Sequence, residues 1–322
     1  MWRHVVPRLA AITELIAVPD DRLRNASVDV WLGDGHQGAL PVTGPQVMQV
    51  HEAGWHTEEL RSSVTPEFIE HLEINIGNAV RAGAHIITPS ADAAGQVERM
   101  FSVPAARVHP VHHGVDSALF RPDLGGGPAL VARSGGRADV PYVLFVGVAH
   151  PRKNIEALRE AMVALADRGF DHQLVLVAGP PRDRPDGDAM IAAAARDLPG
   201  YPGRVVLVPP SSDAQLAAIM AGADLLCLPS LTEGFGLPVL EAMACATPVV
   251  VSNRGALPEV AADGGVLVEP TADDIERGLA LVLSDMKLST RLAVAGRRRA
   301  LELSWERTAA GWLDALQAAA GK

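Results

Sequence analysis

The sequence predicts an α/β protein with two Rossmann-like domains, and three observations support this prediction. Its 322 residues correspond to about two domains at roughly 150 residues each. From Pro141 onward, short runs of branched apolar residues alternate with helix-length stretches, the pattern of parallel strands covered on both faces. Six such runs occur, and six parallel strands form a Rossmann sheet.

The second domain is expected at 141–302, because all six strand candidates lie there. Each candidate is rich in valine and leucine and is bounded by glycine, proline or polar residues. The candidates are Tyr142–Gly147, Gln173–Gly179, Arg204–Pro209, Ala223–Pro229, Pro248–Ser252 and Gly265–Glu269. The segments between them are long enough for the helices that connect parallel strands.

The first domain, assigned to 1–122, has a less regular pattern. The expected strands are Val28–Leu32, Gln46–His51, His85–Pro89 and Arg107–His112, and the expected helices are Pro66–Ala82 and Ala91–Phe101. Residues 1–26 can supply a helix but contain no glycine, so no flexible loop can approach a ligand there. We therefore expect this domain to be shortened.

Two further segments complete the predicted organisation. Five glycines lie between residues 125 and 136 with little periodicity around them, which predicts an interdomain linker at 123–140. Ser304 is of a residue type that caps helix N-termini, so a helix is expected from there to about Ala320. This C-terminal segment, 303–322, is expected to pack across both domains.

Composition excludes several classes of function. Hydrophobic residues make up 48% of the chain and charged residues 20%, which is a globular profile. The net charge is 28 − 38 = −10, a sign that repels the phosphate backbone of nucleic acids. Cys227 and Cys245 are too few for a disulfide framework or a four-cysteine zinc site, and they fit a reducing cytoplasm.

The sequence also argues against a membrane-spanning segment. No apolar run approaches the roughly 18–20 residues that a spanning helix needs. Glu14 interrupts the apolar run near the N-terminus, which argues against a signal peptide. We interpret this region, which also contains several arginines, as an amphipathic surface helix, and this leaves room for peripheral contact with the inner face of a membrane.

The most informative segment is Pro229–Ala244, which follows one strand candidate and opens a helix. Gly234 and Gly236 let the backbone approach a ligand, and Pro238 suits the first helical position. The amides at such a helix start form an anion site. Glu241 falls about one turn later, and helical side chains lean toward the N-terminus, where this carboxylate could accept the two hydroxyls of a ribose.

A lone Gly-x-Gly before a helix is usually an ordinary turn, with Glu241 then a solvated helix residue. The complete segment resembles the signature of retaining glycosyltransferases of family 4, in which two glutamates flank seven residues that contain Gly-Phe-Gly-Leu-Pro. Glu233 and Glu241 fit these two positions. The resemblance extends from about Asp29 to Trp312 and implies the GT-B fold, two Rossmann-like domains that face each other across a cleft.

The resemblance implies a role for each residue of this segment. Glu233 would contact the transferred sugar, and Glu241 would hold the ribose. The backbone amides that would meet the diphosphate and the sugar are those of Gly234, Phe235, Gly236 and Leu237. The backbone near Val208 would read the nucleobase, and the family resemblance favours a UDP- or GDP-linked donor.

Tyr142–Gly147 and the following Arg152 and Lys153 resemble the family's first strand of the second domain and its basic phosphate clamp. Ligands bind outside the carboxyl ends of parallel strands, where these two cations would fall and could neutralise a leaving diphosphate. The alternative, an exposed basic helix start, is unfavourable with the helix dipole. Many relatives have arginine where this chain has Val148, so the residue that replaces that arginine stays open.

The same resemblance covers two histidines. His51 ends a strand candidate and matches a family position near the anomeric carbon, so it is a candidate for binding donor or acceptor; the alternative is a structural histidine. His113, with Gly114, Val115 and Asp116, resembles the strand-exit motif before the linker and indicates hinge geometry.

Three patterns resemble metal sites without supporting one. His51 and His56 are five residues apart, about 140° around a helix, so they cannot share one metal. Asp186–Asp188 resembles the metal-binding motif of other glycosyltransferases but is better explained as an acidic helix start. Residues 109–113 contain three histidines with no carboxylate or cysteine at ligand spacing.

The sequence therefore favours a retaining, metal-independent glycosyltransferase with no cofactor besides its nucleotide-sugar substrate. Its acceptor would be a hydroxyl of a glycan, a lipid-linked molecule or a small molecule. The alternative is a catalytically incompetent homologue that serves as a nucleotide-binding partner or regulatory subunit, and a partner chain or second copy could complete the first domain. A third, weaker reading is a nucleotide-sugar epimerase or a phosphorylase.

Overall fold

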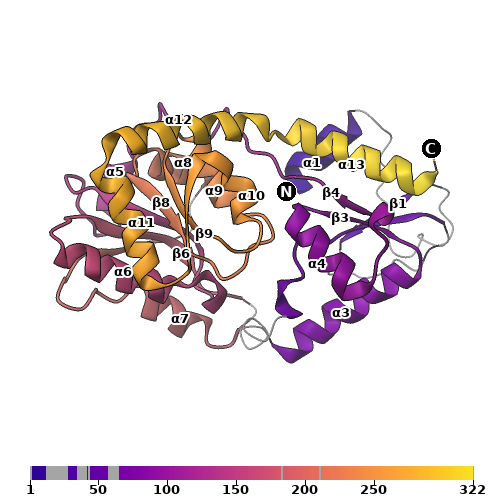
Figure 1. Ribbon diagram of the computed structural model, residues 1–322, viewed down its shortest axis with the longest axis horizontal. Coiled ribbons are helices and arrows are strands. Elements are labelled where there is room, and N and C mark those ends of the chain that lie inside the picture. The colour runs from indigo at the N-terminus through magenta and orange to yellow at the C-terminus, as the bar shows by residue number, and fades with distance from the viewer. Residues whose placement is uncertain are drawn as a thin grey trace. The chain divides into compact units, whose positions relative to one another are not determined.

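A computed structural model describes residues 2–11, 28–34, 42, 44–56, 65–182, 184–209 and 212–321. The chain divides into two compact units. Unit 1 contains residues 1–114 and 303–322, and unit 2 contains residues 115–302. Each unit has a parallel sheet with helices packed against it, as the sequence predicts (Figure 1).

Unit 1 has a four-stranded sheet in the order β1-β2-β3-β4. Its strands are β1 (Trp31–Asp34), β2 (Gln46–Gln49), β3 (His85–Thr88) and β4 (Val108–Pro110). Its helices are α1 (Trp2–Ala10), η2 (Gly54–His56), α3 (Pro66–Arg81), α4 (Ala91–Phe101), η3 (Ala105–Arg107) and α13 (Trp305–Ala320). The predicted strands and helices of this unit are present, with ends that differ by a few residues.

The core of unit 1 forms where α3 and α4 pack with the sheet. Helix α3 buries Ile69, Leu72 and Ile76, spaced by three and four residues, so one face of the helix is apolar. Helix α4 begins at a cap, because the Ser90 hydroxyl accepts a hydrogen bond from the Ala93 amide at 3.1 Å.

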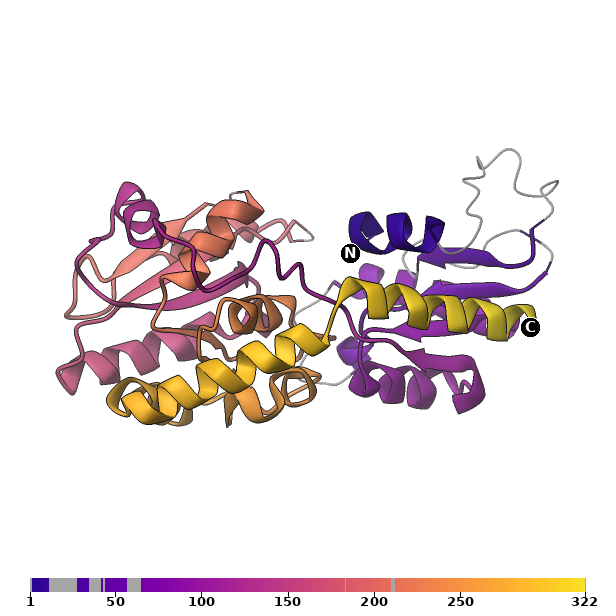
Figure 2. The ribbon, with the colours of Figure 1, turned by 90° about the horizontal axis from the view of Figure 1, so that it is seen from above.

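Helix α13 is part of unit 1 although it comes last in the chain. It packs on β2, β3 and α1 (Figure 2). Ser304 caps its start, accepting a hydrogen bond from the Arg307 amide at 3.3 Å. Gly114 lies so close to this helix start that a Cβ atom there would come within 2.1 Å of the Trp305 nitrogen. The predicted C-terminal helix and its cap are therefore confirmed.

The N-terminal helix is present as α1, and Arg8 pairs with Glu306 of α13 at 2.7 Å. The rest of the predicted helical segment, residues 12–26, lies outside the described residues. The prediction that residues 1–26 supply no flexible loop is therefore not tested beyond α1. Along the described part of the chain, no helix combines the length and the hydropathy that crossing a bilayer requires.

Unit 2 has a six-stranded parallel sheet. Its strands are β5 (Tyr142–Val148), β6 (Gln173–Gly179), β7 (Val205–Val208), β8 (Leu225–Leu228), β9 (Val249–Ser252) and β10 (Gly265–Val268). Its helices are α5 (Gly127–Arg133), η4 (Pro151–Lys153), α6 (Ile155–Asp167), α7 (Gly187–Ala194), α8 (Asp213–Ala221), α9 (Leu237–Ala244), α10 (Leu257–Ala261), η5 (Ala262–Gly264), α11 (Ala272–Ser284) and α12 (Met286–Glu302). The six predicted strands are confirmed.

The strand order of unit 2 is β10-β9-β8-β5-β6-β7. Counted from β5, this is the Rossmann order 3-2-1-4-5-6, read from the opposite edge. The chain builds from β5 outward to β7 and then returns to pair β8 with the free side of β5. The loops that follow β5 and β8 therefore lie next to each other at the carboxyl edge of the sheet.

The stretch predicted as an interdomain linker, 123–140, lies inside unit 2 and contains helix α5. Val131 of this helix is fully buried, and α5 packs on α8. Its first residue, Gly127, approaches α8 so closely that a Cβ atom would lie 2.3 Å from the Ala218 carbonyl oxygen. The glycines that suggested flexibility include one that serves close packing.

Candidate functional site

The candidate site lies in unit 2 at the point where the strand order reverses. Strands β5 and β8 are paired there although β6 and β7 separate them in sequence. The two loops that follow them are joined by a hydrogen bond from the Leu231 amide to the Arg152 carbonyl at 2.8 Å. Open parallel sheets bind ligands at this kind of switch point, outside the carboxyl ends of the strands.

The loop after β5 is held in one conformation by its polar residues. The His150 ring accepts a hydrogen bond from the Arg152 amide at 3.2 Å and so caps η4. Asn154 adopts the left-handed conformation with φ of 56°, which asparagine tolerates well. Its side-chain amide donates to the carbonyls of Pro229 at 3.2 Å and Pro270 at 2.8 Å, which ties this loop to those after β8 and β10.

Two of the predicted site residues, Arg152 and Lys153, contact a third, Glu233. The Lys153 ammonium donates a hydrogen bond to Oε1 of Glu233, and the Arg152 guanidinium lies 3.5 Å from its Oε2. The Ser230 hydroxyl donates to Oε1 at 2.7 Å. Glu233 and Lys153 are each only 6% exposed, so this ion pair is almost completely removed from water. A second serine, Ser252, donates its hydroxyl to the Ser230 carbonyl at 2.5 Å and supports the loop from β9.

The surroundings keep Glu233 ionised. Burial alone raises the pKa of a carboxyl group, because it disfavours the charged form. The charges of Lys153 and Arg152 and the hydrogen bonds from Lys153 and Ser230 outweigh that cost, so the pKa of Glu233 lies below its ordinary value. The site thus holds a fixed carboxylate between two fixed cations.

Gly255 fixes the backbone of Glu233 from the side of β9. It has a φ of 57°, and a Cβ atom there would lie 2.5 Å from the Glu233 oxygen and 2.7 Å from its nitrogen. The amide of Ala256 donates to the same oxygen at 2.9 Å. Only glycine fits this contact, because any side chain would collide with the Glu233 backbone.

The segment predicted to bind an anion is the start of helix α9. Gly236, with φ of 96°, precedes the helix, and Leu237 is its first residue. Glycine offers no side chain to cap the first-turn amides, and that turn contains no acidic residue. Phe235 is buried at this turn, and Glu241 is half-buried one turn further along α9. The predicted helix start and the position of Glu241 on it are therefore present.

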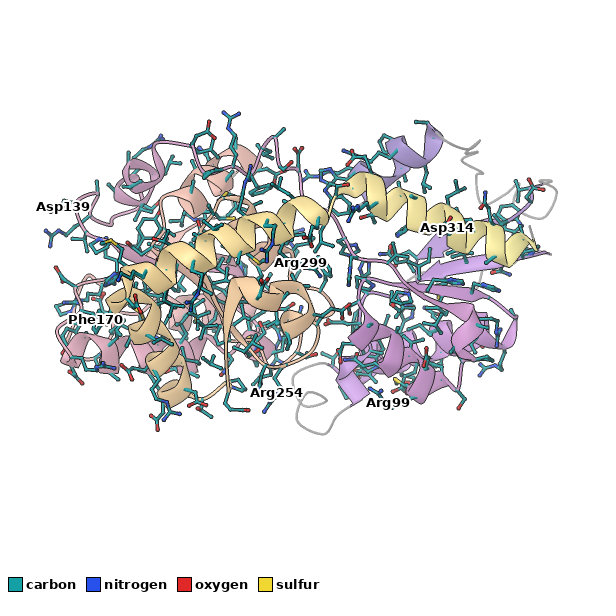
Figure 3. All side chains as sticks on the ribbon, turned by 45° about the horizontal axis from the view of Figure 1, so that its top comes forward. Arg99, Asp139, Phe170, Arg254, Arg299 and Asp314 are labelled. Atoms are coloured by element: carbon teal, nitrogen blue, oxygen red, sulfur yellow. The ribbon has the colours of Figure 1, made fainter. Side chains whose placement is uncertain are left out.

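A second polar cluster lies at the same edge of the sheet, after β9 and β10. Arg254 pairs with Glu269 at 2.7 Å, and the Asn253 amide donates to the same carboxylate at 2.5 Å. Arg254 lies at the surface of unit 2 (Figure 3). The pKa of Glu269 is lowered by the hydrogen bond from Asn253 first and by the Arg254 charge.

Two predicted site residues do not join this group. Val208 is the last residue of β7 and is buried; β5 and β6 separate its strand from β8. His51 belongs to unit 1, where it follows the end of β2 and lies 3.9 Å from the Asp34 carboxylate. Its ring is tilted against that of His113 at 6.2 Å between centroids.

The sequence patterns did not single out three residues that build the site. Ser230 and Gly255 contact Glu233, and Asn154 joins three loops. Only Asn154 carried a usable signal, because asparagine is favoured at helix N-caps and tolerates the left-handed conformation. Among the residues that the structure describes, no three His, Cys, Asp or Glu side chains are arranged to hold a metal ion.

Comparison with known proteins identifies relatives of this chain. The model of the family described as glycosyl transferases group 1 matches residues 130–299, about half of the chain. A D-inositol 3-phosphate glycosyltransferase of Salinispora arenicola is 36% identical over 69% of this chain and 52% of its own length. An MMP alpha-(1->4)-mannosyltransferase of Mycolicibacterium hassiacum is 32% identical over 84% of this chain and 61% of its own length. The chain thus spans about half to two thirds of these relatives.

Solved structures show the same fold. Sucrose-phosphate synthase of Thermosynechococcus elongatus superposes with a TM-score of 0.68 at 26% identity, covering 84% of this chain and 66% of that one. The Anabaena protein HepE, solved in complex with UDP and glucose, superposes with a TM-score of 0.68 at 19% identity, covering 85% and 71%. Two Rossmann-like units in one chain are therefore the architecture of this group.

Proposed function

Because this chain belongs to the family of glycosyl transferases group 1, we propose that it moves a sugar from a nucleotide-sugar donor to a hydroxyl group of an acceptor. The observation that supports this most strongly is the buried pair of Lys153 and Glu233, with the partly exposed Arg152 beside it, at the switch point of unit 2 near the start of helix α9. It combines two cations for a diphosphate with a carboxylate for sugar hydroxyls.

The donor would bind across the carboxyl edge of the unit 2 sheet. Its diphosphate would lie between the start of α9 and the two cations, because helix N-termini and basic side chains both favour anions. Lys153 has three N–H donors and Arg152 has five, so each can hold a phosphate oxygen while it stays close to Glu233. Glu241 would accept the ribose hydroxyls, and Val208 would lie near the nucleobase.

The proposed chemistry is a retaining transfer of the family 4 type. The bond between the anomeric carbon and the diphosphate breaks, and the acceptor oxygen bonds to that carbon on the same face. The acceptor proton passes to the departing diphosphate, so no carboxylate nucleophile is needed. Arg152 and Lys153 neutralise the charge that develops on the leaving group, and this proposal assigns that task to them instead of a metal ion.

Glu233 positions the sugar in this proposal, because it is held too firmly to move toward the anomeric carbon. Two cations and Ser230 hold its side chain, and Gly255 and Ala256 hold its backbone. His51 in unit 1 remains a candidate for contact with the donor or the acceptor. The names of the relatives suggest mannosyl or inositol phosphate chemistry as the first substrates to test.

Calorimetric titration with UDP, GDP and ADP tests the donor site, and incubation with the matching labelled nucleotide-sugars and polyol acceptors tests transfer. We expect one nucleotide to bind selectively and the product to keep the anomeric configuration of the donor, as read by proton NMR. If none of the three nucleotides bound to the folded chain, the donor site would be wrong. Nucleotide binding without transfer would leave the donor site intact and contradict the proposed activity.

A further inference from the structure

Helix α12 has an exposed face with an ordered distribution of side chains. It buries one row, Leu292, Gly296 and Ala300, where it packs on α9 and η5. Met286 and Val294 lie outside that row and are 83% and 66% exposed. Apolar side chains this exposed on a long, well-formed helix leave water in contact with surface that a partner could cover.

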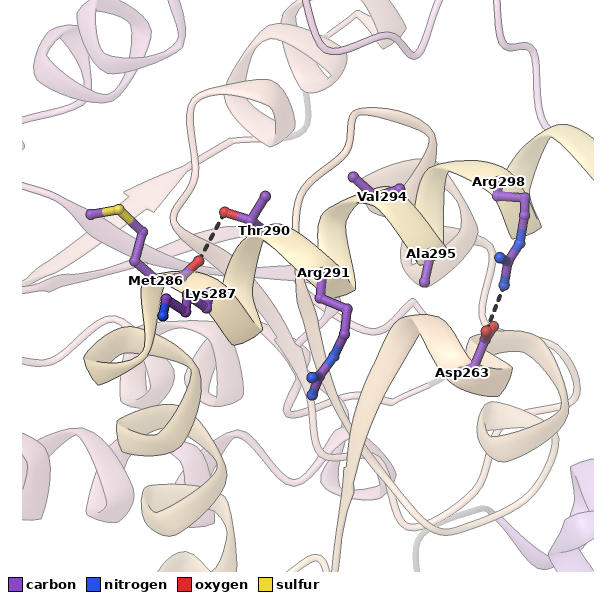
Figure 4. A pocket seen from close by; sticks show the side chains of 8 residues that line it. All are labelled: Asp263, Met286, Lys287, Thr290, Arg291, Val294, Ala295 and Arg298. Atoms are coloured by element: carbon purple, nitrogen blue, oxygen red, sulfur yellow. Dashed lines mark hydrogen bonds and ion pairs between the residues drawn. The ribbon is translucent and has the colours of Figure 1, made fainter.

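The exposed face divides into an apolar row and a basic row. With 3.6 residues per turn, Met286, Thr290 and Val294 fall within roughly 80° of one another around the helix, and Lys287, Arg291 and Arg298 follow within roughly the next 60°. The Thr290 hydroxyl donates to the Met286 carbonyl at 2.8 Å, so its polar atom is already used. Figure 4 shows Arg291 and Arg298 pointing to the same side of α12.

These rows line a groove of about 900 Å³ between α12 and η5. The Asp263 carboxylate, at 2.5 Å, neutralises the charge of Arg298, one of the three basic residues of the groove. In the part of the chain that the structure describes, Lys287 and Arg291 have no carboxylate within ion-pair distance. The groove therefore offers an apolar floor beside two uncompensated positive charges.

The charge of this face opposes that of the chain. Its lining contains three basic residues and one acidic residue, a net charge of 3 − 1 = +2, whereas the whole chain carries −10. Two copies of the chain repel each other over long distances, so a second copy is a poor occupant. An acidic partner is attracted to this face and is oriented by it.

We propose that this groove docks an amphipathic helix of a partner protein, with apolar residues on the floor and Asp or Glu side chains opposite Lys287 and Arg291. Helix-in-groove recognition places the apolar face of the docked helix on apolar groove residues, and the exposed Met286 and Val294 offer such a surface here. A bilayer is disfavoured as the occupant, because α12 contains no aromatic residue of the kind that anchors interfacial helices. The surface is separate from the candidate donor site.

The test uses two designed peptides of about 20 residues, long enough to be helical in water. Both carry leucine at the anchor positions; one has glutamate at the flanking positions and the other has lysine. Binding to the full chain is measured by fluorescence anisotropy, and vesicles of phosphatidylglycerol are tested in parallel by co-sedimentation. We expect the glutamate peptide to bind and the lysine peptide to bind at least about tenfold more weakly.

A charge-swapped variant makes the test specific to this surface. In the double variant Lys287→Glu and Arg291→Glu, the glutamate peptide should lose at least about tenfold in affinity and the lysine peptide should gain. Lys287→Glu places an acidic residue in the first turn of α12, where the helix dipole favours it, so the variant should fold. Equal binding of both peptides, an unchanged double variant, or binding to vesicles without binding to the peptide would each overturn the proposal.

Discussion

The Ser230 hydroxyl donates to Oε1 of Glu233 at 2.7 Å, and both residues are buried. A hydroxyl that donates to a buried carboxylate makes a charge-assisted bond, which is stronger than a bond between neutral groups. Together with Lys153 and Arg152 it explains how a carboxylate can remain charged inside unit 2.

Replacing Ser230 with alanine removes this bond without changing any charge. Unit 2 should lose about 1.5–3 kcal/mol of stability, because a hydrogen bond to a charged group is removed at a buried site. Hydrogen exchange of peptides from β5 and β8 measures the effect in unit 2 itself. Ser284→Ala, at an exposed position near the end of α11, is the matched control and should leave exchange unchanged. Equal exchange in both variants would contradict the role given to Ser230.

The ion pair of Glu233 should make the stability of unit 2 depend on pH. Its pKa is lower in the folded chain than in the unfolded chain, so its contribution is complete above the unfolded value of about 4.5 and is lost as the pH falls. The difference in stability between the wild type and Glu233→Gln should therefore be largest near neutral pH and shrink in acid. Hydrogen exchange at two pH values tests this. A difference that grew in acid would show that the sign is wrong.

Glu241→Ala should weaken nucleotide binding by roughly 1.5–3 kcal/mol, because a charge-assisted contact with the ribose would be lost. Glu241→Gln keeps the size of the side chain and should recover part of that loss. Calorimetry with the nucleotide that binds the wild type gives both values. An unchanged dissociation constant in the alanine variant would rule out the ribose contact.

Gly255→Ala should disturb the site although residue 255 carries no functional side chain. A Cβ atom there collides with the Glu233 backbone, and φ of 57° is unfavourable for alanine, so we expect a cost of roughly 2–4 kcal/mol and loss of sugar transfer. Gly125→Ala is the control, because a Cβ atom there has nothing within 4 Å. Full activity in Gly255→Ala would contradict the predicted contact.

His113 should make unit 1 sensitive to acid. Burial, and then the neighbouring His51, lower its pKa from 6.5 to about 3. Between these values the unfolded chain binds a proton that the folded chain does not. The free energy of unfolding therefore decreases as the pH is lowered, by up to about 1.4 kcal/mol per pH unit. All five tryptophans lie in unit 1, so their fluorescence during urea unfolding reports on this unit. The dependence should be weaker in His113→Gln and unchanged in His71→Gln, a control on the exposed side of α3.

The sequence predicted the fold of unit 2 well, because its inner strands β5, β6, β8 and β9 are almost entirely buried and are rich in valine and leucine. Gln173–Gly179 was predicted with both ends correct. The linker was predicted wrongly, because glycine indicates flexibility and close packing equally well, and Gly127 serves packing. A pattern in one segment does not show which surface a glycine will approach.

The candidate site was predictable only in part, because a local sequence pattern does not show which distant residues will come into contact. The family motif identified Glu233, and the strand-end rule identified Arg152 and Lys153 as residues near the same edge. No local pattern shows that Lys153 and Glu233, 80 residues apart, form a buried pair. Ser230 and Gly255 act through contacts that exist only after the sheet has formed, so residue type alone could not single them out.

The return of α13 to unit 1 sets an order for folding during synthesis. Residues 115–302 leave the ribosome before 303–322, so unit 2 can fold while unit 1 still lacks the helix that packs on β2 and β3. The unit made first is thus the last to be finished, and its uncovered surface is exposed to chaperones and proteases in the meantime. A nascent chain stalled before Leu303 should carry a protected unit 2 and a protease-sensitive unit 1.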